Sequence, residues 1–289
     1  MDMMMLVLSA VLLAVDFLIA GTYQRWEGNT PIKVFRFNFF IGLFSILIFF
    51  FINGCRFEFT AFSAVLAVVM TSLAILYTLI GFKVLAAGNT AYYSFFLMTG
   101  GMVVPYIWGI AFLNEDFSVL RLIGLLMIVG SAFVIYGGKN KMSLKVALMC
   151  AAIFLLNGFV SVISKEHQIS TEAVSSAAYV ILTAAVKVIV CGSLWLGTAL
   201  RSRAQRASSE RISLKAVAIL AASALVSGLS YMLQLNSAAK LPATVVYPII
   251  TGGSVVFTAF AGWLVLKEKP TKELIVGVII SFIGTCLFL

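Results

Sequence analysis

Two ionisable side chains interrupt apolar stretches of this sequence. Asp16 lies within LLAVDFLIAG, and Lys187 lies within LTAAVKVIVCG. A carboxylate in such surroundings can carry a proton or bind a cationic group, and an ammonium can attract a carboxylate or neutralise the acid. Each residue also has a structural explanation. Asp16 can be a hydrogen-bonded carboxyl near a helix end, and the Lys187 stem can run along its helix so that the charge reaches the surface.

Other residue types that commonly perform catalysis are sparse. His167 stands beside Lys165 and Glu166 in a predicted loop, and we expect it to be solvated and not a ligand. The sequence contains no Walker A, HExxH or GxSxG pattern, so it does not indicate an ATPase, a metalloprotease or a serine hydrolase. The four cysteines are isolated from one another and fit neither a zinc pattern nor a disulfide framework. We therefore expect no metal, no cofactor and no enzymatic activity.

The elements that carry these residues are predicted to be membrane helices. The chain is 62% hydrophobic and 11% charged, whereas soluble domains have about 25% charged residues. Apolar stretches of about 20 residues, the length that crosses a bilayer as a helix, recur throughout. The predicted spans are 4–23, 33–53, 61–85, 90–112, 119–136, 144–164, 173–199, 214–238, 243–265 and 272–289. The fold class is thus an all-α integral membrane protein with ten transmembrane helices, and no nucleic-acid partner is indicated.

One segment of the sequence occurs twice. Residues 86–124 and 238–277 each contain an alanine pair, an apolar stretch with Thr-Gly-Gly near its middle, a charged turn with a glutamate, and a second apolar stretch. The glutamates are Glu115 and Glu268, about half the 289-residue chain apart. Such a long period indicates a duplicated half-protein. We predict two five-helix repeats, residues 1–138 and 142–289.

Loop charges indicate that the two repeats are inverted. The loops after odd-numbered spans hold most of the 20 lysines and arginines. Five spans is an odd number, so tandem copies enter the membrane in opposite orientations, and the Lys/Arg bias within each copy reverses accordingly. By the positive-inside rule the odd-numbered loops are cytoplasmic, and both termini lie outside.

The repeated segment resembles the drug/metabolite transporter superfamily, specifically its EamA-type ten-helix members. The matching features are the duplicated helix, the glutamate-containing turns LNEDFSVLRLIG and LKEKPTKELIVG, and the glycine-rich helix after each turn. Arg36 also stands where that family often carries an arginine. The resemblance covers essentially the whole chain and implies secondary transport, commonly export of small metabolites, amino acids or drugs, sometimes by proton exchange. Several relatives have cytoplasmic termini, which conflicts with the loop charges.

The family architecture implies a cavity lined by the first, third and fourth helices of each repeat. Tyrosines and amides there suit a neutral or zwitterionic organic solute, although aromatic residues near helix ends, such as Tyr92 and Tyr93, can instead form an interfacial belt. Asn157 holds roughly the place in the second repeat that Asp16 holds in the first. The peripheral second helix of the family favours the structural explanation of Lys187. The predicted solute-binding residues are Asp16, Tyr77, Tyr92, Tyr93, Thr99, Asn157, Tyr231, Gln234, Asn236, Tyr247 and Thr251.

Paired glycines and prolines interrupt the fourth helix of each repeat. Pro105 follows Gly101 by four residues, and Pro248 precedes Gly252 by four. Each proline removes one helical hydrogen bond, and small residues allow close helix approach or backbone rotation. We predict hinges at Gly101, Pro105, Pro248 and Gly252, with a static kink as the alternative.

Together these features predict a multi-pass carrier of the inner or plasma membrane that exports or exchanges a small organic metabolite by alternating access. Its expected partners are the solute, membrane lipid and a coupling proton, and the chain is a monomer or a homodimer. The alternatives are a non-transporting membrane subunit and an intramembrane enzyme, the second disfavoured by the single histidine.

Overall fold

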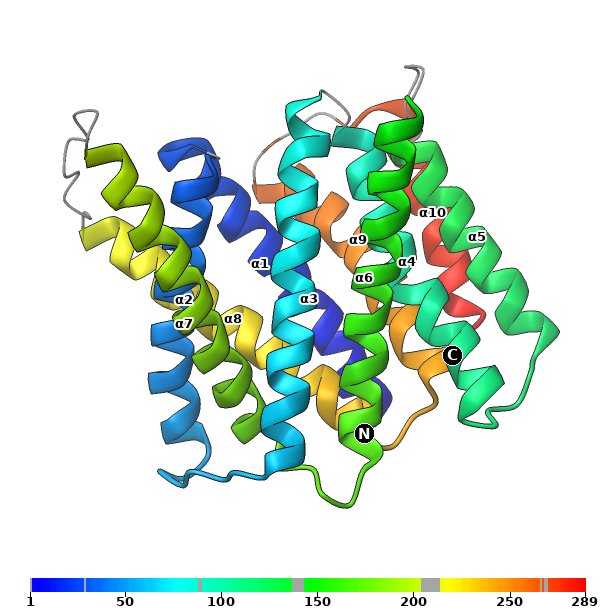
Figure 1. Ribbon diagram of the computed structural model, residues 1–289. Coiled ribbons are helices and arrows are strands. Elements are labelled where there is room, and N and C mark those ends of the chain that lie inside the picture. The colour runs from blue at the N-terminus through cyan, green and yellow to red at the C-terminus, as the bar shows by residue number, and fades with distance from the viewer. Residues whose placement is uncertain are drawn as a thin grey trace.

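All regular structure in the described part of the chain is helical. The computed structural model describes every residue except 1, 29, 88–89, 137–142, 204–213, 266 and 268–269. Figure 1 shows the resulting bundle. The helices are α1 (Asp2–Glu27), α2 (Pro31–Ile52), α3 (Ala61–Ala86), α4 (Thr90–Phe112), α5 (Val119–Tyr136), α6 (Leu144–Ile169), α7 (Ser176–Arg203), α8 (Leu214–Ala238), α9 (Ala243–Val265) and α10 (Lys272–Cys286).

These helices confirm the predicted all-α membrane fold. Within the described residues, α1 to α9 are each long and apolar enough to cross a bilayer. The last helix, α10, is shorter, with 15 residues, which correspond to about 22 Å of rise. Several helices extend past their predicted spans. In particular, α6 continues to Ile169, because polar residues at the end of a membrane helix do not terminate it.

Capping residues fix where several helices begin. The hydroxyls of Thr60, Ser143 and Thr271 accept hydrogen bonds from backbone N–H groups of the first turns of α3, α6 and α10. The second helix begins with Pro31, whose missing N–H costs nothing at that position. Gly28 follows α1 with a φ of +91°, a left-handed conformation that ends a helix at little cost only when the residue is glycine.

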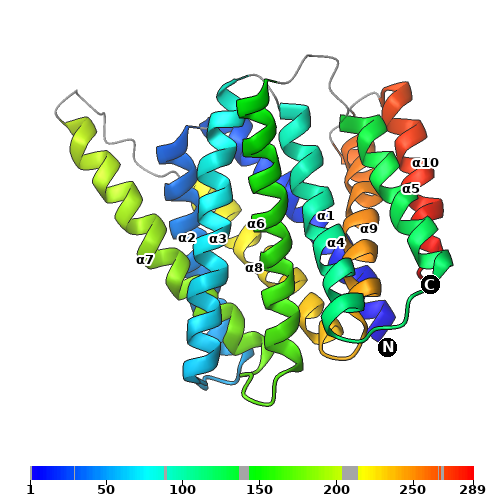
Figure 2. The ribbon, with the colours of Figure 1, turned by 45° about the vertical axis from the view of Figure 1, so that its right-hand side comes forward.

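Helices from the two halves of the chain pack against each other in matching pairs. Three pairs join equivalent helices: α2 with α7, α4 with α9 and α5 with α10. Packing of α1 on α8 and α9 is matched by packing of α6 on α3 and α4. Equivalent helices run in opposite directions. In Figure 1, α1 rises and its equivalent α6 descends, and α3 rises whereas its equivalent α8 descends. Figure 2 shows α2 and α7 at one end of the bundle and α5 and α10 at the other.

Both chain ends lie towards one face of the bundle, which we call the terminal face (Figures 1 and 2). This face carries the connections 53–60, 113–118, 170–175 and 239–242, because each joins a helix that ends there to one that begins there. The remaining helix ends lie at the opposite face.

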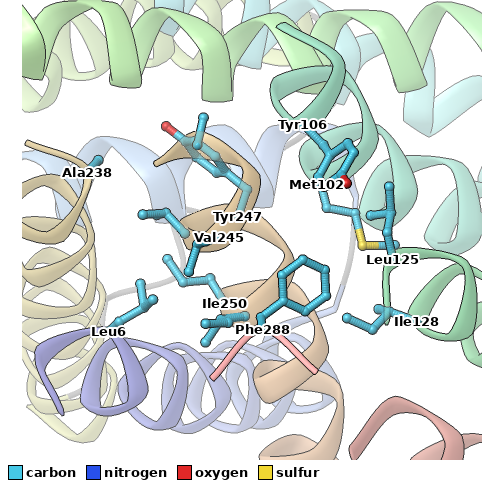
Figure 3. Close-up of a cluster of buried hydrophobic side chains, with 13 residues drawn as sticks. Leu6, Met102, Tyr106, Leu125, Ile128, Ala238, Val245, Tyr247, Ile250 and Phe288 are labelled. Atoms are coloured by element: carbon cyan, nitrogen blue, oxygen red, sulfur yellow. The ribbon is translucent and has the colours of Figure 1, made fainter. Parts of the chain in front are cut away.

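The largest apolar core lies between α1, α4, α5 and α9. Its members include Leu6, Met102, Ile128 and Val246, each fully buried. Figure 3 shows Tyr247 and Tyr106 within this cluster, beside Phe288 from the end of the chain. The packing at this part of the seam between the two halves is therefore apolar and dense.

Candidate functional site

A small polar cavity lies inside the membrane region where α2, α3 and α7 meet. It measures about 130 Å³, enough for about four water molecules or one carboxylate group. Both halves of the chain supply lining residues, since α2 and α3 belong to the first half and α7 belongs to the second. Its lining residues are Phe35, Asn38, Thr71, Ala74, Ile75, Tyr77, Thr78, Lys187 and Cys191.

Lys187 supplies the charge of this cavity. Its ammonium has no hydrogen-bond or ion-pair partner among the described residues, although Asp16 is close enough for the two charges to interact. The helix positions it because Val188 and Ala184, on the neighbouring side of α7, contact α2 at Gly42. The cavity therefore pairs a cation with the side chains of Asn38, Thr78 and Tyr77, a set that suits an anionic or polar group.

Asp16 lies on α1 and faces α8. Its Oδ1 accepts a hydrogen bond of 2.6 Å from the Ser223 hydroxyl. No ion pair joins it to Lys187 in the described part of the chain. Asn157, the expected counterpart of Asp16, instead donates to the Leu97 carbonyl on α4 at 2.7 Å. The two residues thus face different neighbours and are not equivalent in their contacts.

Other predicted solute-binding residues have their polar groups bonded to the protein. Thr99 is buried and donates to the Phe95 carbonyl. Tyr247 is buried too, and its hydroxyl donates to the Ser161 carbonyl at 2.5 Å. The Tyr231 hydroxyl lies 2.9 Å from the Ser164 hydroxyl. These bonds leave Thr99 and Tyr247 little freedom to bind a solute in this conformation.

The remaining candidates are dispersed. Tyr92 and Tyr93 pack in an apolar cluster between α3, α4 and α6, with the Tyr93 ring against Gly81. Gln234 and Asn236 on α8 are partly exposed and have no hydrogen-bond partner among the described residues. Thr251 is partly buried on α9. Within the described part of the chain, the structure thus brings two of the predicted residues, Tyr77 and Lys187, into one cavity, and the charge of Asp16 is close enough to interact with Lys187.

The predicted hinge residues lie at tight helix contacts. A Cβ atom on Gly101 would lie 2.8 Å from the Asn157 amide nitrogen, and one on Gly252 would collide with the Thr285 hydroxyl. Both Pro105 and Pro248 are buried within helices that continue through them. The close packing shows that the glycines allow neighbouring helices to approach. Rotation of the backbone about them stays a prediction.

Glu115 ties the two halves together at the terminal face. Its carboxylate accepts hydrogen bonds from the backbone N–H groups of Ala243, at 2.6 Å, and Thr244, at 2.8 Å. These two residues open α9, so the negative charge also meets the positive end of the helix dipole. Nearby, the Lys165 ammonium donates to the carbonyls of Ala238 and Leu241, each at 2.7 Å. The turn between α8 and α9 is thus held by charged groups at both of its ends.

More contacts between the halves follow along the same face. Trp108 Nε1 donates to Glu166 at 2.6 Å, and Lys240 pairs with Asp2 at 2.9 Å. His167 was expected to be solvated in a loop, and that expectation is wrong. It lies in the last turns of α6, is fully buried, stacks on Tyr179 and bonds to the Ser63 hydroxyl at 2.8 Å.

The loops at this face are joined as well. Glu58 accepts a hydrogen bond of 2.8 Å from the backbone N–H of Ser175. That bond, with smaller contributions from the Ser175 hydroxyl, the Asn53 amide and the nearby Arg56 charge, lowers the pKa of Glu58 below its ordinary value. The ionised carboxylate therefore stabilises the contact between the two loops.

The sequence did not predict that Glu115 joins the two halves of the chain, or that Asn38 and Cys191 line the cavity. For Glu115 a signal was present, since the glutamate recurs in both copies of the repeated turn. Its counterpart, Glu268, lies outside the described residues. Nothing in the sequence marked Asn38 or Cys191, because their importance depends on which face of each helix is turned towards the cavity.

Comparisons with known proteins agree with this architecture. The sequence model of the EamA-like transporter family matches residues 144–289. A solved crystal structure, described only as that of a protein, superposes with a TM-score of 0.69 at 15% sequence identity, covering 98% of this chain and 94% of the other. This likeness concerns the fold. No curated protein matches the chain.

The bundle of long apolar helices defines a multi-pass membrane protein. The chain belongs to the EamA-like transporter family.

Proposed function

We propose that the protein is a secondary transporter that exports or exchanges a small organic metabolite across the inner or plasma membrane by alternating access. The observation that carries this proposal is the polar cavity around Lys187. A bundle with a purely structural role would fill such a space with apolar side chains, as the core around Met102 does. An unfilled polar space inside the membrane instead suits a passing solute.

The proposed moving parts are the two repeats, residues 1–138 and 142–289. Their matched packing and opposite helix directions support this division. The boundary between them falls outside the described residues. Gly101, Pro105, Pro248 and Gly252 would absorb the rotation of one repeat against the other, since α4 and α9 pack together at the seam.

The bonds of Glu115 and its neighbours close the terminal face, so the solute would enter the cavity from the opposite face in this conformation. By the positive-inside rule, the loop charges predict that the opposite face is cytoplasmic. The cavity of about 130 Å³ holds only one polar group of a solute, whereas binding pockets for whole small molecules measure roughly 300–1,000 Å³. The rest of the site would therefore form when the repeats separate.

Asp16 is the proposed carrier of a coupling proton. Its charge interacts with that of Lys187, and Ser223 is its one hydrogen-bond partner among the described residues. Proton binding at Asp16 would change the field at Lys187 and hence the affinity of the cavity for an anionic group.

The test begins with purified protein and a panel of amino acids, amines, carboxylic acids and sugars, screened for thermal stabilisation. A stabilising solute is then measured for transport in proteoliposomes. We expect Lys187→Met to lower the initial rate at least about 10-fold, because one charge-assisted hydrogen bond is lost. Lys215→Gln, an exposed lysine at the opposite face, should match the parent protein.

In the same liposomes Asp16→Asn should abolish transport driven by a pH gradient and retain exchange at equilibrium. Absence of any transported solute, together with copurification of one membrane partner, would make the chain a non-transporting subunit. Accumulation of a modified lipid would instead indicate an enzyme.

A further inference from the structure

A groove runs along the outer surface of the bundle between α3 and α6. It has a volume of about 630 Å³ and is open to the membrane. Two cationic side chains, Lys83 and Lys145, lie in it. The other lining residues are Ile80 of α3 and Leu144, Leu148, Met149 and Ala152 of α6. No feature of the proposed transport site uses this groove.

The two lysines lie at the same level of the membrane. Lys83 is in the last turn of α3 and Lys145 is in the first turn of α6. Both of these helix ends lie at the opposite face, as Figure 1 shows. Both lysines therefore lie at the level where the bilayer is expected to change from hydrocarbon to headgroups.

Neither charge is compensated within the described part of the chain. Lys83 and Lys145 are exposed and have no hydrogen-bond or ion-pair partner there. Other lysines differ, since Lys165 bonds to two backbone carbonyls and Lys240 pairs with Asp2. An anion from outside the chain would therefore find two cations without a partner among the described residues in one groove.

The apolar part of the groove extends away from these charges into the membrane. Leu144, Leu148 and Ala152 follow one another at four-residue spacing on α6, and so they share one side of the helix. Leu144 is 78% exposed and Leu148 is 64% exposed. From Leu144 to Ala152 the helix rises about 12 Å, and this apolar strip is long enough to contact much of one acyl chain.

We propose that this groove binds one anionic phospholipid, with its phosphate between Lys83 and Lys145 and one acyl chain along Leu144, Leu148 and Ala152. Charge complementarity selects an anionic headgroup, and the apolar strip selects a molecule with a chain. A free phosphate has the negative charge but no apolar chain, and an apolar helix of a partner protein lacks the negative charge. The inference does not depend on the proposed transport function.

Binding is measured by native mass spectrometry of the detergent-solubilised protein titrated with phosphatidylglycerol or phosphatidylcholine. We expect the parent protein to retain phosphatidylglycerol preferentially. The double variant Lys83→Gln/Lys145→Gln should bind it about 30-fold more weakly, the combined effect of two lysines near a membrane surface. Its affinity for phosphatidylcholine should hardly change.

The matched control removes the same charge from the same face. Lys215 and Lys272 are exposed and lie in the first turns of α8 and α10. The variant Lys215→Gln/Lys272→Gln should keep the affinity for phosphatidylglycerol within about twofold. An equal loss in both double variants would mean that general surface charge attracts the lipid, and it would overturn the proposed site.

A second variant tests the apolar half of the groove. Ala152→Phe fills the strip while keeping both lysines, so phosphatidylglycerol should bind at least about 10-fold more weakly. Glycerol phosphate, which has the headgroup charge but no acyl chain, should bind the parent protein weakly. Equal affinities for glycerol phosphate and phosphatidylglycerol, or unchanged lipid binding in the lysine double variant, would overturn the proposal.

Discussion

Lys187 carries its ammonium into the membrane region with no counter-ion in contact among the described residues. A lysine at the centre of a membrane helix costs about 2.5–3.5 kcal/mol on insertion scales. The cavity that it lines offers the hydroxyl of Thr78 and the amide oxygen of Asn38, whose amide nitrogen donates to the Val34 carbonyl. Neutral polar groups reduce this cost only in part. This uncompensated cost supports the proposal that Lys187 binds a polar group of a solute.

Glu58 illustrates a charge outside the membrane that stabilises the terminal face. Its bond to the Ser175 N–H lowers its pKa, so the folded state favours the ionised carboxylate. The stabilisation is present above the ordinary pKa of a glutamate, about 4.3, and is lost as the pH falls through the lowered folded-state value.

We therefore predict that Glu58→Gln lowers the midpoint of thermal unfolding by roughly 2 °C at pH 7. The difference from the parent protein should shrink as the pH falls below about 4, where the native carboxyl begins to be protonated. Thermal unfolding in detergent across this pH range provides the measurement. A difference that stays constant down to about pH 3 would show that the charge of Glu58 has no part in it.

At the scale of whole helices, glycines decide how closely the bundle packs. The contact between α4 and α6 brings backbone against backbone. A Cβ atom on Gly100 would collide with the Phe154 carbonyl oxygen, and one on Gly158 would collide with the Val104 side chain. In a membrane, where burial of apolar groups gives no advantage over lipid, such close contact provides much of the attraction between helices.

The substitution Gly158→Ala should force α4 and α6 apart. We expect the midpoint of thermal unfolding to fall by about 5 °C. Gly130 is the matched control, because it is also a helical glycine but a Cβ atom added to it would meet nothing within 4 Å. Gly130→Ala should leave the midpoint unchanged or raise it. Equal effects of the two substitutions would contradict the packing argument.

At the scale of the molecule, bonds between the two halves of the chain gather at the terminal face. Glu115 reaches the start of α9, Trp108 reaches Glu166, and His167 reaches Ser63. The cavity beside Lys187 lies deeper in the bundle. Under the proposed alternating access, opening of the terminal face would require these bonds to break.

We predict that Glu115→Gln favours opening of the terminal face. The amide can accept one of the two N–H bonds but brings no charge to the start of α9. Cys191, which lines the cavity, serves as the reporter in a protein whose other three cysteines are replaced by alanine. A membrane-impermeant thiol reagent applied at the terminal face should modify it about 10-fold faster.

The control for this experiment is Asp116→Asn. Asp116 is adjacent to Glu115 and exposed, and it has no partner among the described residues. Its substitution should leave the modification rate of Cys191 unchanged. If both variants react at the rate of the parent protein, Glu115 does not control access from this face.

The sequence by itself determined the class of protein, the approximate spans and the polarity of the loops. Each follows from local composition, since a bilayer requires about 20 apolar residues in a row and excludes charged loops. It also marked Asp16 and Lys187, because ionisable groups within a span are costly wherever they point, and the family resemblance added Tyr77.

Only the tertiary structure decided which of these polar groups meet. Lys187 lies beside Asn38 and Cys191, Glu115 reaches a helix that begins 128 residues later, and His167 is buried. The physical reason is that a membrane helix is apolar on every side. Its hydrophobic pattern therefore does not indicate which side faces lipid, another helix or a cavity, and packing alone makes that choice.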